Sequence, residues 1–307
     1  MKKVLIATDK PFAKVAVDGI RKIVEEAGHK LELLEKYTSE EQLLQAVADV
    51  DAMIVRSDIV NQNVVNAAKN LKIVVRAGAG YDNLDLKACS EKNIVAMNTP
   101  GQNSNAVAEL AFGLMVYGIR KLFSGASGTE LRDKTIGIHA YGNVGYYVAK
   151  IAHGFGMKVY AFDPYVSAEK MKADNVQPVN TVEDLYKTCQ FVSLHIPAIE
   201  ATKKSINKKL LSLMPAGAVL VNTARKEVID EDELVAVMEE RKDLIYLSDI
   251  IPGNEKVFVE KFPGRYFFTP KKMGAQTEEA NINAGFAAAR QIVDYFKTGN
   301  ETFRVNK

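Results

Sequence analysis

Short apolar runs alternate along the chain with longer stretches of helical periodicity. Most of the runs are continuously apolar, as in parallel strands that are covered on both faces. They predict strands at 4–9, 52–58, 72–78, 93–98, 135–140, 158–164, 190–197, 218–224, 244–250 and 265–270. Helical periods are clearest over 103–123, 144–155, 231–240 and 277–297. This alternation predicts an α/β protein with doubly wound parallel sheets.

Two loops suggest where the chain divides. A length of 307 residues suggests roughly two domains, and the loop segments 98–103 and 274–285 are the candidate boundaries. The middle block, 100–283, contains the glycine-rich motif described below. We expect the two ends, 1–99 and 284–307, to form the other domain together, because a terminal helix must pack somewhere. The composition alone does not demand this arrangement.

Composition and charge exclude several classes of function. The 40 Lys and Arg against 38 Asp and Glu give no electrostatic reason to expect nucleic acid or an anionic membrane as partner. Two distant cysteines, Cys89 and Cys189, exclude a disulfide scaffold or a multi-cysteine metal site, and four scattered histidines disfavour a histidine cage. The chain lacks a signal-peptide core and an apolar run of membrane-spanning length, so we expect a cytoplasmic protein without a metal.

A glycine-rich turn follows the predicted strand 135–140. The letters AYGNVG match the last two glycines of the template G-x-G-x-x-G, Gly142 and Gly145, and Ala140 stands at the first position. The middle glycine lets the backbone approach a pyrophosphate, the last allows close strand–helix packing, and the helix N-terminus attracts the anion. The methyl group of Ala140 is tolerable provided that its φ is negative.

An acidic residue lies at the spacing that a dinucleotide site requires. Asp163 ends the next predicted strand, close to the distance of about 20 residues at which an acid binds the adenosine ribose 2′-hydroxyl. A carboxylate there repels a 2′-phosphate and therefore favours NAD over NADP. The alternative is an ordinary βαβ turn with a surface aspartate, but the strand–loop–helix–strand context favours the dinucleotide site.

At this point the chain resembles the D-2-hydroxyacid dehydrogenases along essentially its whole length. The motifs that carry the resemblance are RAGAGYDNLDL (76–86), NTPGQNSNAVAEL (98–110), AYGNVG (140–145), NTAR (222–225), SDI (248–250) and GAQTEEA (274–280). The first and last are similar to those of D-3-phosphoglycerate dehydrogenases. Because the chain stops after its last helix, it resembles a short form without a C-terminal regulatory domain.

The resemblance implies an architecture. It implies two Rossmann-like domains, with the NAD-binding domain inserted into the substrate-binding domain and the active site in the cleft between them. It also implies NAD as cofactor and a homodimer built largely through the cofactor domain.

The resemblance also implies roles for residues on the substrate side. Arg225 matches the arginine that binds the substrate carboxylate and carbonyl, which suits a guanidinium because it can grip a carboxylate with two hydrogen bonds. The other matching positions are the backbone turn of Gly78, Ala79 and Gly80, the substrate-contacting Asn103, and Arg56 with Ser57 near the distal end of the substrate. Arg56 is the main reason to expect a phosphorylated substrate, and a rim salt bridge is its alternative role.

On the cofactor side, the resemblance assigns contacts to residues at the ends of several predicted strands. Asp249 is expected near the nicotinamide amide, and the loop of Asn143 and Val144 near the pyrophosphate. The full set is Gly142, Asn143, Val144, Gly145, Asp163, His195, Pro197, Thr202, Thr223, Ala224 and Asp249.

The family pattern breaks at the acid/base position. The family has a histidine just before the last helix, whereas alignment from GAQTEEA places Lys272 there, with Lys271 as one extra residue. The family also has a glutamate five residues after the aspartate of the SDI motif. Asn254 occupies that position here and Glu255 follows, so the sequence leaves open which of them corresponds to the glutamate.

These two departures are consistent with one change in chemistry. Hydride transfer to or from a carbonyl carbon needs a proton donor or acceptor at the oxygen. A lysine starts near a pKa of 10.4, so a carboxylate partner would raise that pKa further. Loss of the carboxylate, burial of the amine and the nearby Arg225 would each lower it. We therefore expect Lys272 to be the acid/base; the alternative is a surface lysine in a chain without catalysis.

Three functions remain open on the sequence. The first is NAD-dependent oxidation of D-3-phosphoglycerate to 3-phosphohydroxypyruvate, the first step of serine biosynthesis. The second is the same chemistry on another D-2-hydroxy acid, related to glyoxylate, hydroxypyruvate or lactate. The third is a non-catalytic NAD(H)-sensing protein, which the presence of Arg225 and Lys272 disfavours.

Overall fold

The computed structural model describes residues 1–306 and divides into two compact units. Unit 1 comprises Met1–Asn103 and Gln276–Lys307, of which Lys307 lies outside the described residues, and unit 2 comprises Ser104–Ala275. The expected boundaries were 99/100 and 283/284. The second was placed too late, because the start of helix α12 (Glu278–Thr298) already packs on unit 1. There Ile282 and Ala284 share an apolar cluster with Ile20.

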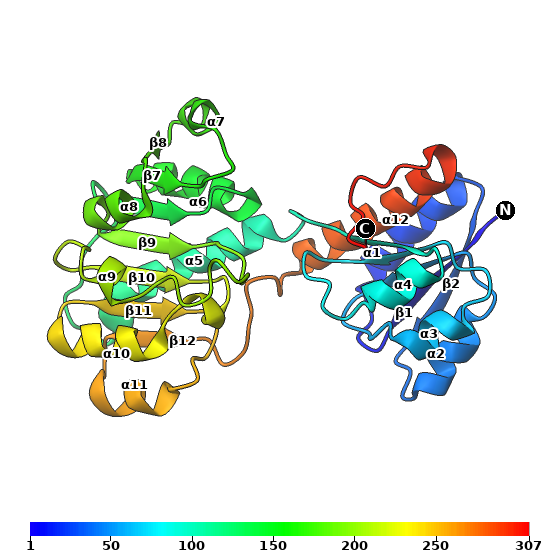
Figure 1. The fold of residues 1–307 in the computed structure, drawn as a ribbon, viewed down its shortest axis with the longest axis horizontal. Helices are drawn as coiled ribbons and strands as arrows, with labels where there is room; N and C mark the ends of the chain where they lie inside the picture. The colour runs from blue at the N-terminus through cyan, green and yellow to red at the C-terminus, as the bar shows by residue number, and fades with distance from the viewer. Residues whose placement is uncertain (307) are drawn as a thin grey trace. The chain divides into compact units, whose positions relative to one another are not determined.

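Unit 1 is a five-stranded parallel sheet in the order β2-β1-β3-β4-β5, with helices on both faces (Figure 1). Helices α1 and α12 share one apolar cluster, and α2, α3 and α4 share the cluster on the other face. The strands are β1 (Lys3–Thr8), β2 (Lys30–Glu35), β3 (Ala52–Val55), β4 (Ile73–Arg76) and β5 (Val95–Asn98). The remaining helices are α1 (Lys14–Glu26), α2 (Glu40–Val47), α3 (Gln62–Ala67) and α4 (Leu86–Glu91).

Unit 2 is a seven-stranded parallel sheet in the order β12-β11-β10-β9-β6-β7-β8. Helices α5 and α6 cover one face, and α8, α9, α10 and α11 pack into the cluster on the other. The strands are β6 (Thr135–His139), β7 (Lys158–Phe162), β8 (Gln177–Pro178), β9 (Phe191–Leu194), β10 (Val219–Asn222), β11 (Ile245–Ser248) and β12 (Tyr266–Phe268). The helices are α5 (Ser104–Ile119), α6 (Asn143–Gly154), α7 (Ala168–Ala173), α8 (Val182–Thr188), α9 (Lys208–Leu211), α10 (Glu231–Glu240) and α11 (Glu255–Lys261), with short 3₁₀ turns η1 (Lys121–Phe123) and η2 (Lys226–Val228).

The predicted fold class, two doubly wound parallel sheets, is confirmed. Two strands were not predicted. β2 is an edge strand of sequence KLELLE in which charged residues interrupt the leucines and only Leu31 is buried, and β8 is only two residues long. Within residues 1–306, no helix combines the length and the apolar character needed to cross a membrane.

Parallel pairing gives each sheet one edge at which all the strands end. In unit 2 the chain direction across the sheet reverses at β6, which pairs with β7 on one side and β9 on the other. In unit 1 the same happens at β1, between β2 and β3. Ligands of such sheets bind outside the carboxyl ends of the strands, at these reversal points.

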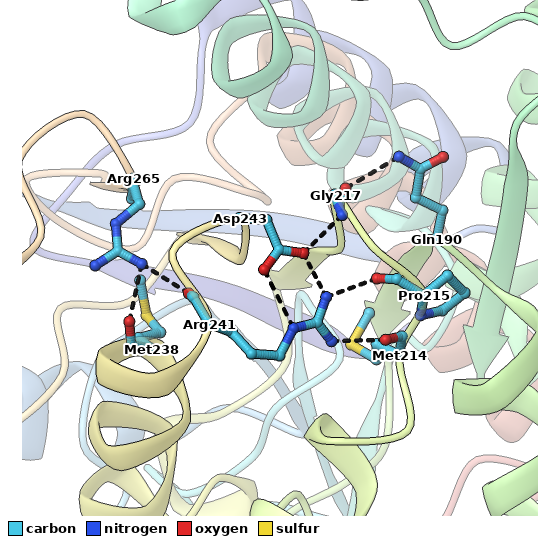
Figure 2. A network of polar contacts seen from close by, with 8 residues as sticks. All are labelled: Gln190, Met214, Pro215, Gly217, Met238, Arg241, Asp243 and Arg265. Carbon is cyan, nitrogen blue, oxygen red and sulfur yellow. Dashed lines mark hydrogen bonds and ion pairs between the residues drawn. The ribbon is translucent and has the colours of Figure 1, made fainter.

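The opposite, amino edge of the unit 2 sheet is held by a polar network (Figure 2). Arg241 donates to the carbonyls of Met214 and Pro215 and forms a two-point ion pair with Asp243. Asp243 in turn accepts the Gly217 N–H at 2.7 Å. The pair with Arg241 lowers the pKa of Asp243 to about 2. These contacts join the loops that precede β10 and β11, and they fix the start of each strand.

Candidate functional site

The turn between β6 and α6 has the features of an anion site. Gly142 begins the helix and has no side chain to cap its first N–H groups, and the space where a Cβ would lie is open. The helices α7, α8, α9 and α10 are instead capped by Ser167, Thr181, Asn207 and Asp230. A Cβ on Gly145 would lie 2.5 Å from the Ala140 carbonyl oxygen. The turn therefore fits a pyrophosphate, since its free N–H groups lie at the positive end of the helix.

Ala140 does not adopt the backbone conformation that its tolerance was expected to require. Its φ is +81°, in the left-handed region. The strand hydrogen bond from Ala140 N–H to the Phe162 carbonyl and the close approach of Gly145 hold it there. A non-glycine residue with such a φ carries strain of about 1–2 kcal/mol. The negative φ on which the tolerance of Ala140 depended is therefore not observed, and the turn stores conformational strain at the first position of the motif.

Asp163 follows β7 and lies beside this turn. Its carboxylate accepts the Tyr141 N–H and the Tyr165 N–H, each at 2.8 Å. These bonds connect the end of β7 to the glycine turn after β6. A carboxylate oxygen can accept more than one hydrogen bond, so Asp163 retains acceptor capacity for a ribose hydroxyl.

Two histidines lie at the carboxyl edge near β6 and β9. His195 contacts the Ser193 hydroxyl at 2.9 Å through Nε2 and the Thr223 hydroxyl at 3.5 Å through Nδ1. Burial lowers the pKa of His195 to about 3, and the proximity of His139 contributes. Burial likewise lowers the pKa of His139 to about 4. Both imidazoles are therefore neutral at physiological pH and act as uncharged polar groups.

The hydroxyl of Thr202 is engaged within its own loop. It donates to the Pro197 and Ile199 carbonyls and accepts the Ile199 N–H at 2.9 Å. Thr202 and Pro197 are thus brought together, as parts of one turn after β9.

Arg225 and Lys272 meet at one carbonyl oxygen beyond β10. Arg225 Nη1 donates to the Ala224 carbonyl at 2.9 Å, and Lys272 Nζ donates to the same oxygen at 3.2 Å. Ala224 and Thr223 are buried, whereas Arg225 and Lys272 are exposed. The segments after β10 and after β12 therefore bring two basic side chains to the same carbonyl oxygen at this edge.

The turn that presents Arg225 is shaped by Asn222, which the sequence reasoning did not single out. Asn222 is fully buried at the end of β10. Its amide accepts the Ala224 N–H and donates to the Arg225 carbonyl, both at 3.0 Å. A polar residue that closes an otherwise apolar buried run is the signal that could have identified it.

Asp249, Asn254 and Glu255 follow β11 and differ in their burial and their hydrogen-bond partners. Asp249 is fully buried, and its carboxylate accepts hydrogen bonds from the segment that bears Lys272. Asn254 precedes α11 and donates to the Glu231 carbonyl at 3.2 Å, with its own side-chain oxygen buried and unpaired. Glu255 is exposed in the first turn of α11.

In unit 1, the guanidinium of Arg56 is engaged by protein groups. Arg56 donates to the carbonyls of Lys10 and Pro11 and, at 2.7 Å, to the side chain of Asn281 in α12. It also lies 5.1 Å from the ring centre of Phe12. Burial lowers the pKa of Arg56 from its ordinary value. The acceptors are two carbonyl oxygens and an amide oxygen, which differs from the rim salt bridge that was the alternative role of Arg56.

The turn after β4 carries the glycine pair expected to hold a carboxylate. Gly78 has a φ of +149°, and a Cβ there would lie 1.5 Å from Nη1 of Arg76. The positive φ favours glycine, whereas the close atom is the far end of the flexible Arg76 side chain. Arg76 donates through Nε to the Arg56 carbonyl, and Asn98 donates to the Ala79 carbonyl at 2.6 Å. Gly80 follows directly and is half-buried.

Ser57 and Asn103 lie at the edges of unit 1. Ser57 is exposed and lines a cavity of about 430 Å³ together with Tyr37, Asp9 and Asp58. The acidic lining disfavours an anion in this cavity. Asn103 is the last residue of the first segment of unit 1, directly before α5.

The chain is similar to known proteins in both sequence and structure. The family model described as "D-isomer specific 2-hydroxyacid dehydrogenase, NAD binding domain" matches residues 119–260, which lie within unit 2. A hydroxypyruvate reductase of Thermotoga maritima is 33% identical over 284 residues, covering 86% of this chain and 90% of that protein. The chain belongs to the D-2-hydroxyacid dehydrogenase family.

Other relatives are phosphoglycerate dehydrogenases. The D-3-phosphoglycerate dehydrogenase of Methanocaldococcus jannaschii is 34% identical over 290 residues, covering 88% of this chain but 54% of that protein. The chain thus spans about half the length of that relative. The NAD⁺-bound 3-phosphoglycerate dehydrogenase of Entamoeba histolytica is 49% identical, with a TM-score of 0.86 over 100% of this chain and 99% of the other.

Proposed function

We propose that this protein is an NAD-dependent dehydrogenase that oxidises D-3-phosphoglycerate to 3-phosphohydroxypyruvate, the first step of serine biosynthesis. The observation that carries this proposal is the pairing of Arg225 and Lys272 on the Ala224 carbonyl oxygen. The 49% identity to the E. histolytica phosphoglycerate dehydrogenase over the full chain supports the substrate.

In this proposal each of the two basic side chains has a distinct task. Arg225 pairs with the substrate carboxylate and polarises the forming carbonyl, as a planar guanidinium can do with parallel hydrogen bonds. Lys272 Nζ takes the proton of the C2 hydroxyl in oxidation and returns it in reduction. A bound nicotinamide supplies the acceptor for the hydride that leaves C2. Loss of hydride and proton together converts the alcohol into the ketone.

The other assigned residues bind and orient. The glycine turn Gly142–Gly145 and Asp163 hold the dinucleotide, and the carboxylate of Asp163 disfavours a 2′-phosphate. Gly78, Ala79, Gly80 and Asn103 serve the substrate from unit 1. We also propose a homodimer, as the family resemblance implies, and a cytoplasmic location. Sedimentation of the purified protein tests the dimer.

A second candidate function is reduction of hydroxypyruvate or another unphosphorylated 2-oxo acid. Two observations favour it. The Arg56 guanidinium already donates to two carbonyls and to Asn281, and Ser57 lines an acidic cavity. Neither arrangement favours a phosphate at that position. The T. maritima hydroxypyruvate reductase, matched over 90% of its length, points the same way.

One set of assays separates these functions. NADH oxidation is followed at 340 nm with 3-phosphohydroxypyruvate, hydroxypyruvate, glyoxylate and pyruvate. Preference for the phosphorylated acid by about tenfold or more in kcat/KM supports the first function, and preference for hydroxypyruvate supports the second. Absence of turnover with all four acids, together with tight NADH binding, indicates a binding protein instead.

The role of Lys272 is tested with two neighbouring lysines. Lys272→Ala should lower kcat by about two or more orders of magnitude with little change in NADH affinity, because a general acid/base contributes about that much. Lys271→Ala is the matched control and should retain normal turnover. Equal activity of the two variants would contradict the assignment.

A further inference from the structure

The carboxylate of Asp249 binds both ends of the short segment that carries Lys272. Its Oδ1 accepts the Thr269 hydroxyl at 2.8 Å, just before the segment, and the Met273 N–H at 2.7 Å, just after Lys272. Its Oδ2 accepts the Gly274 N–H at 2.7 Å. Asp249 itself is fully buried, and Thr269 is 4% exposed.

The backbone at position 274 approaches Asp249 so closely that an added side chain would be crowded. A Cβ on Gly274 would lie 3.0 Å from Asp249 Oδ2 and 3.2 Å from Val107. Hydrogen bonds to an ionised carboxylate are about twice as strong as neutral ones. The segment between Thr269 and Gly274 is therefore held to the end of β11, and Lys272 projects from it toward the Ala224 carbonyl.

We infer that Asp249 is a positioning residue that holds Lys272 in place for proton transfer. This role rests on the proposed function of Lys272 and differs from the contact with the nicotinamide amide that the sequence suggested. A general acid or base must be held within hydrogen-bond reach of the atom that gains or loses the proton. Asp249 supplies that constraint through the backbone on the C-terminal side of Lys272 and through Thr269 on the other side.

The decisive variant is Asp249→Asn, which keeps the shape and removes the charge. We expect kcat for 3-phosphohydroxypyruvate, or for the best substrate of the assays above, to fall by about 10- to 100-fold, while KM changes by less than about threefold. Hydrogen exchange of the peptide covering 269–275 should accelerate at least about tenfold, with the sheet peptides unchanged.

Cofactor binding separates positioning from a nicotinamide contact. Affinities for NADH and for ADP-ribose, which lacks nicotinamide, are measured in the parent protein and in Asp249→Asn. If Asp249 positions Lys272, the ratio of the NADH affinity to the ADP-ribose affinity should be the same in the variant as in the parent protein. If the variant keeps full kcat at saturating NADH but loses NADH affinity relative to ADP-ribose, the positioning role is wrong.

A milder variant guards against misfolding. Thr269→Val removes one hydrogen bond to Asp249 from the side opposite Gly274 and should lower kcat by about three- to tenfold. In a Lys272→Ala background, neither Thr269→Val nor Asp249→Asn should lower the residual rate further, because coupled residues are non-additive. Full additivity would overturn the inference. If Lys272→Ala keeps normal turnover while Asp249→Asn still accelerates exchange of 269–275, the catalytic assignment fails and the anchoring role stands.

Discussion

The two edges of the unit 2 sheet use arginine in opposite ways. At the amino edge, Arg241 donates to two backbone carbonyls and to both oxygens of Asp243 (Figure 2). Arg265 beside it donates to the Met238 and Arg241 carbonyls. At the carboxyl edge, Arg225 is exposed and donates to the carbonyl of the preceding residue.

The difference shows which edge is built for stability and which for binding. A guanidinium has five N–H donors, and the Arg241 network directs them to acceptors within the protein. The exposed guanidinium of Arg225 instead directs donors to solvent, where an anion could replace water. In a parallel sheet the carboxyl ends are the edge where ligands bind. The comparison therefore predicts that substitutions at the two edges affect different measurements.

The largest effect is expected for Arg225→Ala. Removal of the group that pairs with the substrate carboxylate should lower kcat/KM by about three orders of magnitude, because charge-assisted, two-point binding is lost. The urea midpoint of unfolding should not change, since the side chain is exposed. Lys226→Ala, at the adjacent exposed position, is the control and should keep normal kinetics. A large loss of stability in Arg225→Ala would erase the contrast between the edges.

Arg241→Ala should show the reverse behaviour. We expect a loss of about 2–3 kcal/mol in the free energy of unfolding, because two carbonyls lose their donor and Asp243 loses its partner. Activity per folded molecule should stay normal. Lys209→Ala breaks an exposed ion pair with Glu183 and should cost about 0.5 kcal/mol or less. Urea denaturation and steady-state kinetics of the same samples test this pair of variants.

The neutral histidines predict an acid-sensitive carboxyl edge. His139 has a folded-state pKa of about 4, below its ordinary value of 6.5. The unfolded chain therefore binds more protons between these pH values, and stability falls as pH drops from 6.5 to 4, by about 3 kcal/mol for this residue. Asp243, at the amino edge, has its pKa lowered from 3.8 to about 2, so its protonation reduces the stability only below pH 3.8.

Denaturation midpoints at intervals from pH 7 to 4 measure this effect. His139→Gln should flatten the pH dependence in that window. The exposed His153 provides the control, since His153→Gln should leave the slope unchanged. A parent protein whose stability is constant from pH 6.5 to 4 would contradict the prediction.

The smallest effect concerns the strained turn after β6. Ala140→Gly should raise the free energy of unfolding by about 1 kcal/mol, because glycine adopts a positive φ without steric cost. Ala149→Gly, in the interior of α6, should instead lower it by about 1 kcal/mol or more. Thermal or urea denaturation distinguishes the signs. Destabilisation by Ala140→Gly would show that the methyl group packs usefully in this turn.

Much of the fold could be predicted because local pattern and global arrangement agree. Buried parallel strands are continuously apolar, so strands such as β6 and β10 are evident in the sequence. The edge strand β2 was missed because charged residues interrupt its leucines and only Leu31 is buried. The boundary before α12 was misplaced because the motif GAQTEEA marks a loop but not the unit on which the helix packs.

For the candidate site, the sequence could suggest which residues take part but not which groups they contact. Motif spacing singled out the glycine turn, because the required residue types recur at definite distances along the chain, whereas Arg225 and Lys272 were suggested by the resemblance to the family. Spacing did not identify Asn222 as the residue that shapes the turn before Arg225, nor Asn281 as the partner of Arg56. The first contact depends on the local shape of the turn after β10, and the second joins two side chains that are 225 residues apart, so neither can be read from motif spacing.

The sequence by itself determined two parallel α/β sheets and a glycine-rich turn between a strand and a helix, because periodicity and spacing are local properties. The tertiary structure decided which hydrogen bonds and backbone conformations these residues adopt. It joins Lys272 to Ala224, ties Asp249 to the segment around Lys272, engages Arg56 with carbonyls and holds Ala140 at a positive φ. Each of these depends on how strands far apart in the chain end at one edge, and only packing sets that geometry.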